Sequence, residues 1–170
     1  MKKIKFLLYI SIILLSMNAR AQIDQNVVYA LMIHKFAQYT EWPANKKQGD
    51  FVIGVVGNTS VYEKLKDVAQ KKKIGTRAIV VKKFPSVNEI ADCHMIFVPE
   101  SEKNHLPTVS SKVKPKNTVI VSEAANTTSP FIFNFIKQGS NVKFQLNNSN
   151  ASAHGVKVSS KLVKLAIKVS

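Results

Sequence analysis

One stretch of the chain, 27–57, constrains the fold most, because a helical pattern, a proline and a strand pattern follow one another in it. The helical pattern places apolar side chains three and four residues apart, at Tyr29, Met32, Ile33, Phe36 and Tyr39. Pro43 has no backbone N–H and disfavours helical backbone at Trp42, so we expect the helix to end before them. Residues 51–56 are a short apolar run rich in β-branched side chains, which favours a buried strand. This order predicts one half of an α/β domain.

Helical and strand patterns keep alternating after this unit. Alternation at this spacing is typical of a parallel sheet with helices on both faces. The strand patterns are short and continuously apolar, as expected when helices cover both sides of the sheet. The expected helices span 25–40, 61–70 and 101–113, and 86–91 is expected to form a short helix or a turn. The expected strands span 51–56, 77–81, 95–98 and 118–121.

The alternation of helical and strand patterns ends after Ser122. Two strand patterns, 131–136 and 142–146, are separated by a five-residue loop that contains Gly139, which predicts a hairpin. The sequence therefore predicts one α/β domain of three layers. Its sheet is mixed and mostly parallel, with about six strands, helices on both faces, and a C-terminal hairpin followed by a helix.

The last expected helix, 156–169, combines two stripes. Apolar residues at positions 158, 162, 165 and 169 form one stripe, which we expect to pack on the sheet. Lys157, Lys161, Lys164 and Lys168 repeat the same spacing about 100° round the helix. The lysine stripe has two interpretations: a solvated helix edge, or a contact surface for an acidic partner or a membrane.

The N-terminus has the pattern of a secretory signal peptide. Residues 1–21 contain a basic start, an apolar run over 6–15 and the small-x-small sequence 19–21. We therefore expect cleavage before Gln22 and a periplasmic protein; an uncleaved anchor is the alternative. Cleavage would remove four of the 25 basic residues and none of the ten acidic ones, leaving a net charge of +11.

A basic exported protein is expected to meet particular partners. Export argues against nucleic acid and favours anionic lipid headgroups, polyanionic glycans or an acidic protein. The alternative is that the lysines only solvate the surface, since they are scattered along the chain.

No catalytic pattern stands out in the sequence. The four histidines lie far apart, none in metal-ligating helical spacing, and no serine has a G-x-S-x-G context. We therefore expect no enzyme, cofactor or metal site. Cys93 and His94 precede the third strand, and we expect them to be packed residues at the end of that strand. The minor alternative is that they form part of a thiol or metal site.

Aromatic residues close the first helix. Phe36, Tyr39 and the only tryptophan, Trp42, form either a cap on the core or an aromatic surface that binds a partner. With the four lysines above, these three residues are the predicted partner-binding set.

An ordered set of segments resembles the YfiR-like family of exported bacterial proteins. The resemblance covers nearly all of 22–170. Its segments are HKFAQYTEWP (34–43), FVIGVVG (51–57), CHMIFV (93–98), TVIVSE (118–123), VKFQLN (142–147) and HGVKVSSKLVKLA (154–166).

The resemblance implies a periplasmic α/β domain, often dimeric, without known catalytic activity. The best understood member inhibits a membrane diguanylate cyclase by binding the periplasmic sensor region of that enzyme. That member carries paired cysteines, whereas this chain has Cys93 alone, which excludes an internal disulfide. The glycine pair usual before the fifth strand is replaced by 129–131, and we expect partner contacts to differ at 131–136 and 149–154.

Two functions of different classes follow. The first is repression of a membrane-bound signalling protein, a diguanylate cyclase or a sensor kinase, through binding of its sensor region; a homodimer is a further expected assembly. The second is a small-ligand-binding or envelope structural module that uses the carboxyl ends of the strands, near Gly57 and Pro99-Glu100.

Overall fold

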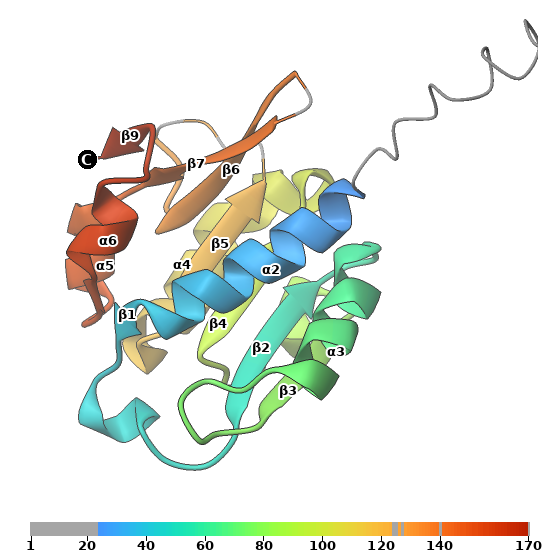
Figure 1. Cartoon of the computed structure of the whole chain (residues 1–170), viewed down its shortest axis with the longest axis vertical. Coiled ribbons are helices and arrows are strands. Elements are labelled where there is room, and N and C mark those ends of the chain that lie inside the picture. The colour runs from blue at the N-terminus through green and yellow to red at the C-terminus, as the bar shows by residue number, and fades with distance from the viewer. Residues whose placement is uncertain (1–23, 124–125, 127, 140, 170) are drawn as a thin grey trace, which may run out of the picture.

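In the computed structural model, which describes residues 24–123, 126, 128–139 and 141–169, a seven-stranded sheet runs through the protein (Figure 1). The predicted signal peptide, 1–21, lies outside these residues. The strands are β2 (Phe51–Val56), β3 (Ile79–Phe84), β4 (Met95–Val98), β5 (Val119–Glu123), β6 (Phe133–Gln138), β7 (Asn141–Leu146) and the two-residue β9 (Lys168–Val169). Their order is β3–β2–β4–β5–β6–β7–β9, parallel from β3 to β6 and antiparallel between β6 and β7. The predicted mixed, mostly parallel sheet is confirmed.

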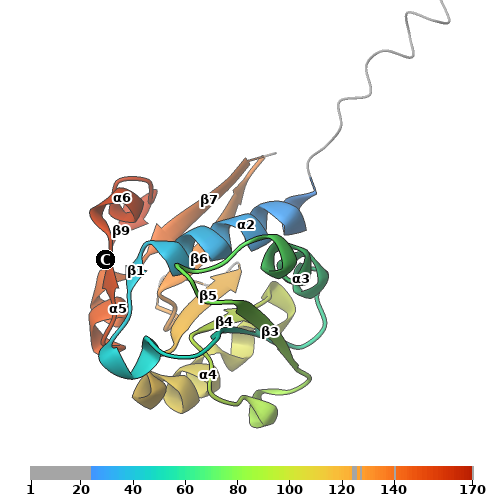
Figure 2. The ribbon, with the colours of Figure 1, turned by 60° about the horizontal axis from the view of Figure 1, so that its bottom comes forward.

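Helices cover both faces of the sheet, as predicted (Figure 2). On one face lie α2 (Gln25–Gln38) and α3 (Val61–Lys71); on the other lies α4 (Leu106–Val113), preceded by the 3-10 helix η4 (Glu100–His105). Shorter elements are β1 (Thr40–Glu41), η2 (Ala44–Lys46), η3 (Val87–Glu89), η5 (Lys114–Lys116), α5 (Asn148–Ala153), β8 (Lys157–Val158) and α6 (Ser160–Val163). Within the described residues, no helix is long and apolar enough to span a bilayer.

Four strands differ from the prediction in their bounds: β3, β5, β6 and β7. Strand β3 runs over 79–84 rather than 77–81, because Arg77 closes a tight turn by bonding to Ile74, and the strand continues through two exposed lysines at the sheet edge. The five-residue loop predicted for the hairpin is wrong, because Gln138, directly before Gly139, pairs with Asn141. A positive φ of 59° at Gly139 suits such a tight turn.

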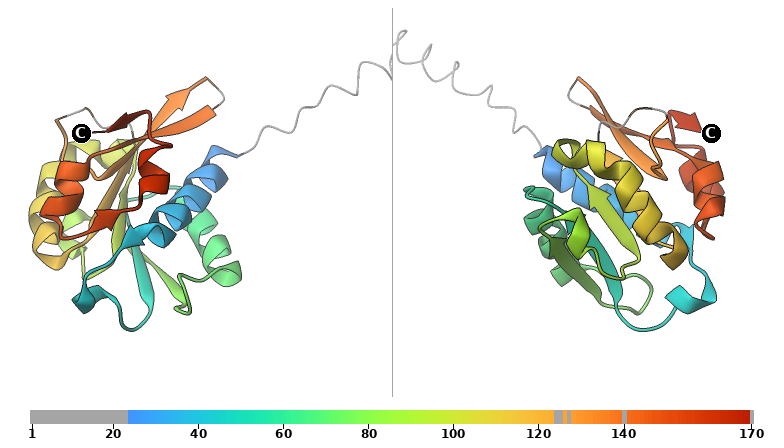
Figure 3. Two further views of the ribbon diagram at one scale, coloured as in Figure 1. Left: turned by 60° about the vertical axis from the view of Figure 1, so that its left-hand side comes forward. Right: turned by 180° about the vertical axis from the view of Figure 1, so that it is seen from behind.

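The predicted single helix over 156–169 is wrong. Gly155, with a φ of 66°, ends the turn after α5, and Val158 then pairs with Thr40 in the small sheet β1–β8. Helix α6 is only four residues long, with Ser159 as its N-cap, and β9 pairs with the end of β7. Backbone pairing with two strands distant in the sequence therefore replaces the continuous helix, and Figure 3 (left) shows α5, α6 and β9 grouped together.

The core is divided by the sheet. The sequence predicts one core region for Phe36, Trp42, Val55 and Ile96. The first three belong to the cluster under α2 and α3, whereas Ile96 belongs to the cluster on the α4 side, so this prediction is wrong for Ile96. Neighbouring residues of a strand point to opposite faces, which separates Ile96 from that group.

Candidate partner-binding surface

Two of the predicted partner-binding residues are part of the core. Phe36 is 1% exposed and Trp42 is 8% exposed. The indole of Trp42 donates to the carbonyl of Ala37 at 3.2 Å and meets Phe51 edge-on, with ring centroids 5.1 Å apart. Both aromatic rings therefore hold α2 and the chain after it on the sheet, and neither forms an outer contact surface.

Tyr39, in contrast, is half-buried at the end of α2 and lies between two lysines. Lys35 Nζ is 5.9 Å and Lys161 Nζ is 5.6 Å from the centroid of its ring. The Tyr39 carbonyl accepts a hydrogen bond from the backbone N–H of Ser159 at 2.9 Å, which fixes α6 beside α2. The structure thus brings Tyr39 and Lys161 together with cation–π geometry.

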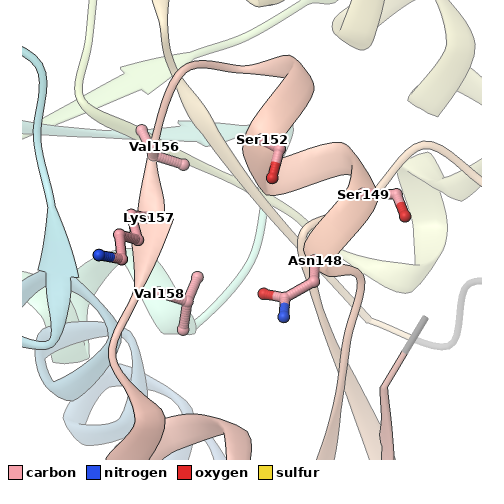
Figure 4. A pocket seen from close by; sticks show the side chains of 6 residues that line it. All are labelled: Asn148, Ser149, Ser152, Val156, Lys157 and Val158. Atoms are coloured by element: carbon pink, nitrogen blue, oxygen red, sulfur yellow. The ribbon is translucent and has the colours of Figure 1, made fainter.

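The small sheet β1–β8 extends this surface toward α5. Lys157 lies opposite Glu41 in that sheet and is exposed. Figure 4 shows α5 beside the segment 156–158, with the Asn148 amide pointing toward Val158. A hollow of about 340 Å³ is lined by Asn148, Ser149, Ser152, Val156, Lys157 and Val158. We call Lys35, Tyr39, Lys157, Lys161 and the α5 side chains of this hollow the ribbon surface.

Lys164 and Lys168 do not continue a stripe with Lys157 and Lys161, because no helix joins the four lysines. Lys164 follows α6 in a turn and Lys168 lies in β9; both are exposed. The four lysines thus lie on four successive structural segments, and of these four only Lys157 and Lys161 belong to the ribbon surface. The corrected geometry divides the predicted charge surface into two parts.

The carboxyl ends of the parallel strands offer a second hollow, which includes Glu100 of the predicted place but not Gly57. At Gly57 a side chain would approach Glu102 Oε1 to 2.8 Å, so that position is already covered. The hollow, about 290 Å³, lies beside α2, β5 and β6 and is lined by Tyr29, Glu100, Glu123, Phe135, Ile136 and Lys137.

Polar contacts organise this second hollow. The Tyr29 hydroxyl donates to Glu123 Oε1 at 3.1 Å, and Lys137 Nζ lies 3.6 Å from the same oxygen. Burial, followed by the charge of Glu123, raises the pKa of the Tyr29 phenol well above its usual range. The hydroxyl therefore stays protonated and donates to the carboxylate.

Cys93 and His94 do not form a thiol–imidazole pair. Cys93 is buried in the cluster on the α4 side, while the His94 ring stacks on Phe51 on the other side. Burial raises the pKa of the Cys93 thiol to about 11, which keeps it protonated and unreactive. In the described part of the chain, no three His, Cys, Asp or Glu residues gather to hold a metal ion.

His94 instead belongs to a polar cluster that fixes the loop 46–50. Its Nδ1 accepts from the Val52 backbone N–H at 3.0 Å, and its Nε2 lies 3.1 Å from the carbonyl of Lys46. Arg77 donates to the carbonyls of Lys46, Gln48, Gly49 and Asp50 at 2.6 to 3.1 Å. Sequence analysis missed this cluster, although Arg77 is the only arginine in 22–170 and a planar guanidinium suits such multiple bonding.

His94 makes the stability of the domain depend on pH. Burial, then the charges of Arg77 and Lys46, lower the pKa of the imidazole to about 4. The unfolded chain regains a value of about 6.5, so between these pH values the unfolded state binds more protons than the folded state. We expect the free energy of unfolding to fall as pH drops from about 6.5 to about 4, by on the order of 3 kcal/mol from this residue.

Urea unfolding at about pH 7 and about pH 4.5, for wild type and His94→Asn, measures this contribution. Asparagine keeps an acceptor for the Val52 N–H and does not titrate in this range. His34 and His154, whose pKa values are lowered by burial, keep a pH dependence of the same sign in both proteins. An equal loss of stability in wild type and variant would contradict the role of His94.

A comparison with known protein families identifies the family of this chain. A family model described as YfiR/HmsC-like matches residues 26–167. That family comprises periplasmic regulators of diguanylate cyclases, and its members are generally regulatory proteins rather than enzymes. None of the curated proteins matches the chain. The match covers six of the seven strands of the large sheet, all but β9, together with its covering helices and the ribbon surface, and the chain belongs to the YfiR/HmsC-like family.

Proposed function

We propose that the protein represses a membrane diguanylate cyclase by binding the periplasmic sensor region of that enzyme with the ribbon surface. A sensor kinase with a similar sensor region is the alternative partner. The observation that carries the proposal is the half-buried Tyr39 ring between Lys35 and Lys161. Family membership supports a regulatory role of this kind.

The chemistry of the ribbon surface suits an acidic protein partner. Tyrosine offers a large, rigid contact area with a hydroxyl at its end and is enriched among residues that dominate binding energy. The lysines around it attract carboxylates and raise the association rate more than they slow dissociation. The hollow beside α5 offers amide and hydroxyl groups that could accept a side chain of the partner.

Repression follows if the protein binds one state of the sensor region more tightly than the other. The equilibrium between the two states then shifts by the difference in affinity. Binding of a periplasmic sensor region requires export, and we propose that residues 1–21 direct it and that the mature protein begins at Gln22. Mass analysis of the exported protein that finds Met1 retained would contradict that start.

Site-specific photo-cross-linking tests the proposed interaction. We would place benzoylphenylalanine at position 39 in the native host and identify the cross-linked proteins by mass spectrometry. Position 82 on the edge strand β3 is the matched control, because Lys82 is exposed and remote from the ribbon surface in the sheet order. We expect position 39 to capture an inner-membrane protein that carries a cyclase domain.

Three other outcomes would count against the proposal. Capture of a second copy of the chain alone would make the ribbon surface a homodimer interface. Equal capture of the same protein at position 82 would show that the capture is not specific to the ribbon surface. Absence of any signalling protein among the products at position 39 would reject the surface as the binding site.

The second hollow supports a second candidate function, binding of a small cationic ligand. Glu100 and Glu123 line it together with the aromatic rings of Phe135 and Tyr29. These two rings stack with centroids 4.3 Å apart. A thermal-shift screen of small amines checks this function. Stabilisation of wild type but not of Glu123→Gln would favour it, and equal shifts in both proteins would reject it.

A further inference from the structure

Charge is distributed very unevenly along the chain. Glu123 is the last acidic residue, and 124–170 contain six lysines and no aspartate or glutamate. Among the residues that the structure describes, no carboxylate forms an ion pair with Lys161, Lys164 or Lys168. These three cations therefore remain available to an external anion.

The same segment exposes aliphatic side chains. Leu165 is 67% exposed and Ile167 is 44% exposed, and with Leu31 they are the large apolar residues most open to solvent in the described chain. Ala166, between them, packs against the core instead. Leu165 and Ile167 therefore face the solvent from the turn that follows α6, whereas Ala166 faces the core.

The backbone holds this segment in place. Ile167 N–H donates to the carbonyl of Phe144 at 3.0 Å, and Leu165 N–H donates to that of Leu162 at 3.0 Å. Lys168 pairs with Gln145 in the sheet. The segment 164–168, which we call the C-terminal loop, is thus a fixed feature with two aliphatic side chains flanked by two lysines.

We propose that the C-terminal loop docks on an anionic phospholipid bilayer. Leu165 and Ile167 would enter the boundary between headgroups and acyl chains, as the apolar side of interfacial segments does. Lys164 and Lys168 would lie among the phosphates, where each cation near an anionic surface adds to binding. An acidic protein would satisfy the lysines but leaves the paired, outward aliphatic side chains unexplained, so the bilayer fits both observations.

Docking would also orient the ribbon surface. Lys161 of that surface lies one helical turn before Lys164, and Ser159 N–H ties the intervening α6 to Tyr39. The ribbon surface would then lie close to the membrane, where the sensor region of a membrane protein emerges. The docking itself does not depend on the proposed repression, and the two can fail separately.

Vesicle sedimentation with the purified protein tests docking without any protein partner. The vesicles contain phosphatidylglycerol with phosphatidylethanolamine, or phosphatidylcholine alone. We expect binding to the first kind only, and weaker binding at high salt because exposed charges are screened beyond about 8 Å at physiological ionic strength. Reversing Lys164 and Lys168 to glutamate should weaken binding at least about thirtyfold.

Matched variants separate specific docking from general attraction. Lys72→Glu with Lys82→Glu makes the same charge change at exposed positions near the opposite sheet edge and should leave binding within about threefold. Leu165→Ser with Ile167→Ser should reduce binding at least about tenfold, whereas Leu31→Ser should not. Circular dichroism confirms that each variant is folded.

Several results would overturn the proposal. They are failure of wild type to bind the anionic vesicles, equal losses in the two charge-reversal variants, and unchanged binding of the Leu165/Ile167 variant. Loss of partner capture in that variant without any vesicle binding by wild type would assign the loop to a protein contact instead.

Discussion

Replacing Phe36 by alanine is expected to lower the free energy of unfolding by about 3–5 kcal/mol, a large part of the stability of a domain of this size. The ring stacks on Phe133 with centroids 4.0 Å apart and meets Phe144 at 4.9 Å. Its removal leaves a cavity between α2 and strands β6 and β7. Those strands are fixed by their ladder of hydrogen bonds, so the cavity collapses only in part.

Leu31→Ala is the matched control for this prediction. Leu31 lies on the same helix, five residues earlier, but is 41% exposed. Its truncation should change the free energy of unfolding by less than about 0.5 kcal/mol. Urea unfolding followed by circular dichroism measures both variants. Similar losses in the two variants would mean that the core does not centre on Phe36.

Replacing Tyr39 by alanine is expected to weaken binding of the sensor region at least about thirtyfold, the effect of removing a residue that dominates an interface. The phenol ring is the only aromatic group on the ribbon surface as defined above, and two lysines lie within 6 Å of its centroid. Loss of the ring removes both the contact area and the group that positions the cations. Surface plasmon resonance against the sensor region identified by cross-linking measures the affinity.

Tyr39→Phe is the control, because it keeps the ring and the cation–π geometry. We expect its affinity to stay within about threefold of wild type. Trp42→Ala is expected to act differently: the buried indole supports the fold, so this variant should lose stability before it loses specific contacts. A folded Tyr39→Ala protein that binds like wild type would show that the ring has no role in recognition.

The parallel strands were predictable because local sequence determines them. The runs 51–56 and 95–98 are covered by helices on both faces, so they are continuously apolar, and the observed bounds of β2 and β4 agree with the prediction. Strand β3 was placed less well. It forms the sheet edge, and its exposed lysines at 82 and 83 carry no strand signal.

The C-terminal region could not be predicted in the same way. Its apolar and basic residues repeat with helical spacing, and the spacing favoured one helix over 156–169. The decisive contacts are non-local: Val158 pairs with Thr40, and Lys168 pairs with Gln145. The periodicity within the segment carries no information on these partners, because Gln145 precedes Lys168 by more than 20 residues and Thr40 precedes Val158 by more than 100.

The candidate surface was predicted only in part, because the sequence does not report which side chains are buried. Residue type indicates that Phe36, Tyr39 and Trp42 are aromatic and adjacent to a helix end, but not which ring faces outward. Burial separates them: Tyr39 remains accessible, and the other two support the core. Lys35 was missed because it belongs to α2, and its contact with the Tyr39 ring depends on side-chain geometry.

The concentration of cyclic-di-GMP in the native host tests the central claim most directly. The measurement compares wild type, a strain that lacks the gene, and that strain complemented with wild type, Tyr39→Phe or Tyr39→Ala at equal protein levels. We predict that deletion raises the concentration, that wild type and Tyr39→Phe restore it, and that Tyr39→Ala does not. An unchanged concentration on deletion, or full restoration by Tyr39→Ala, would contradict repression of a cyclase through the ribbon surface.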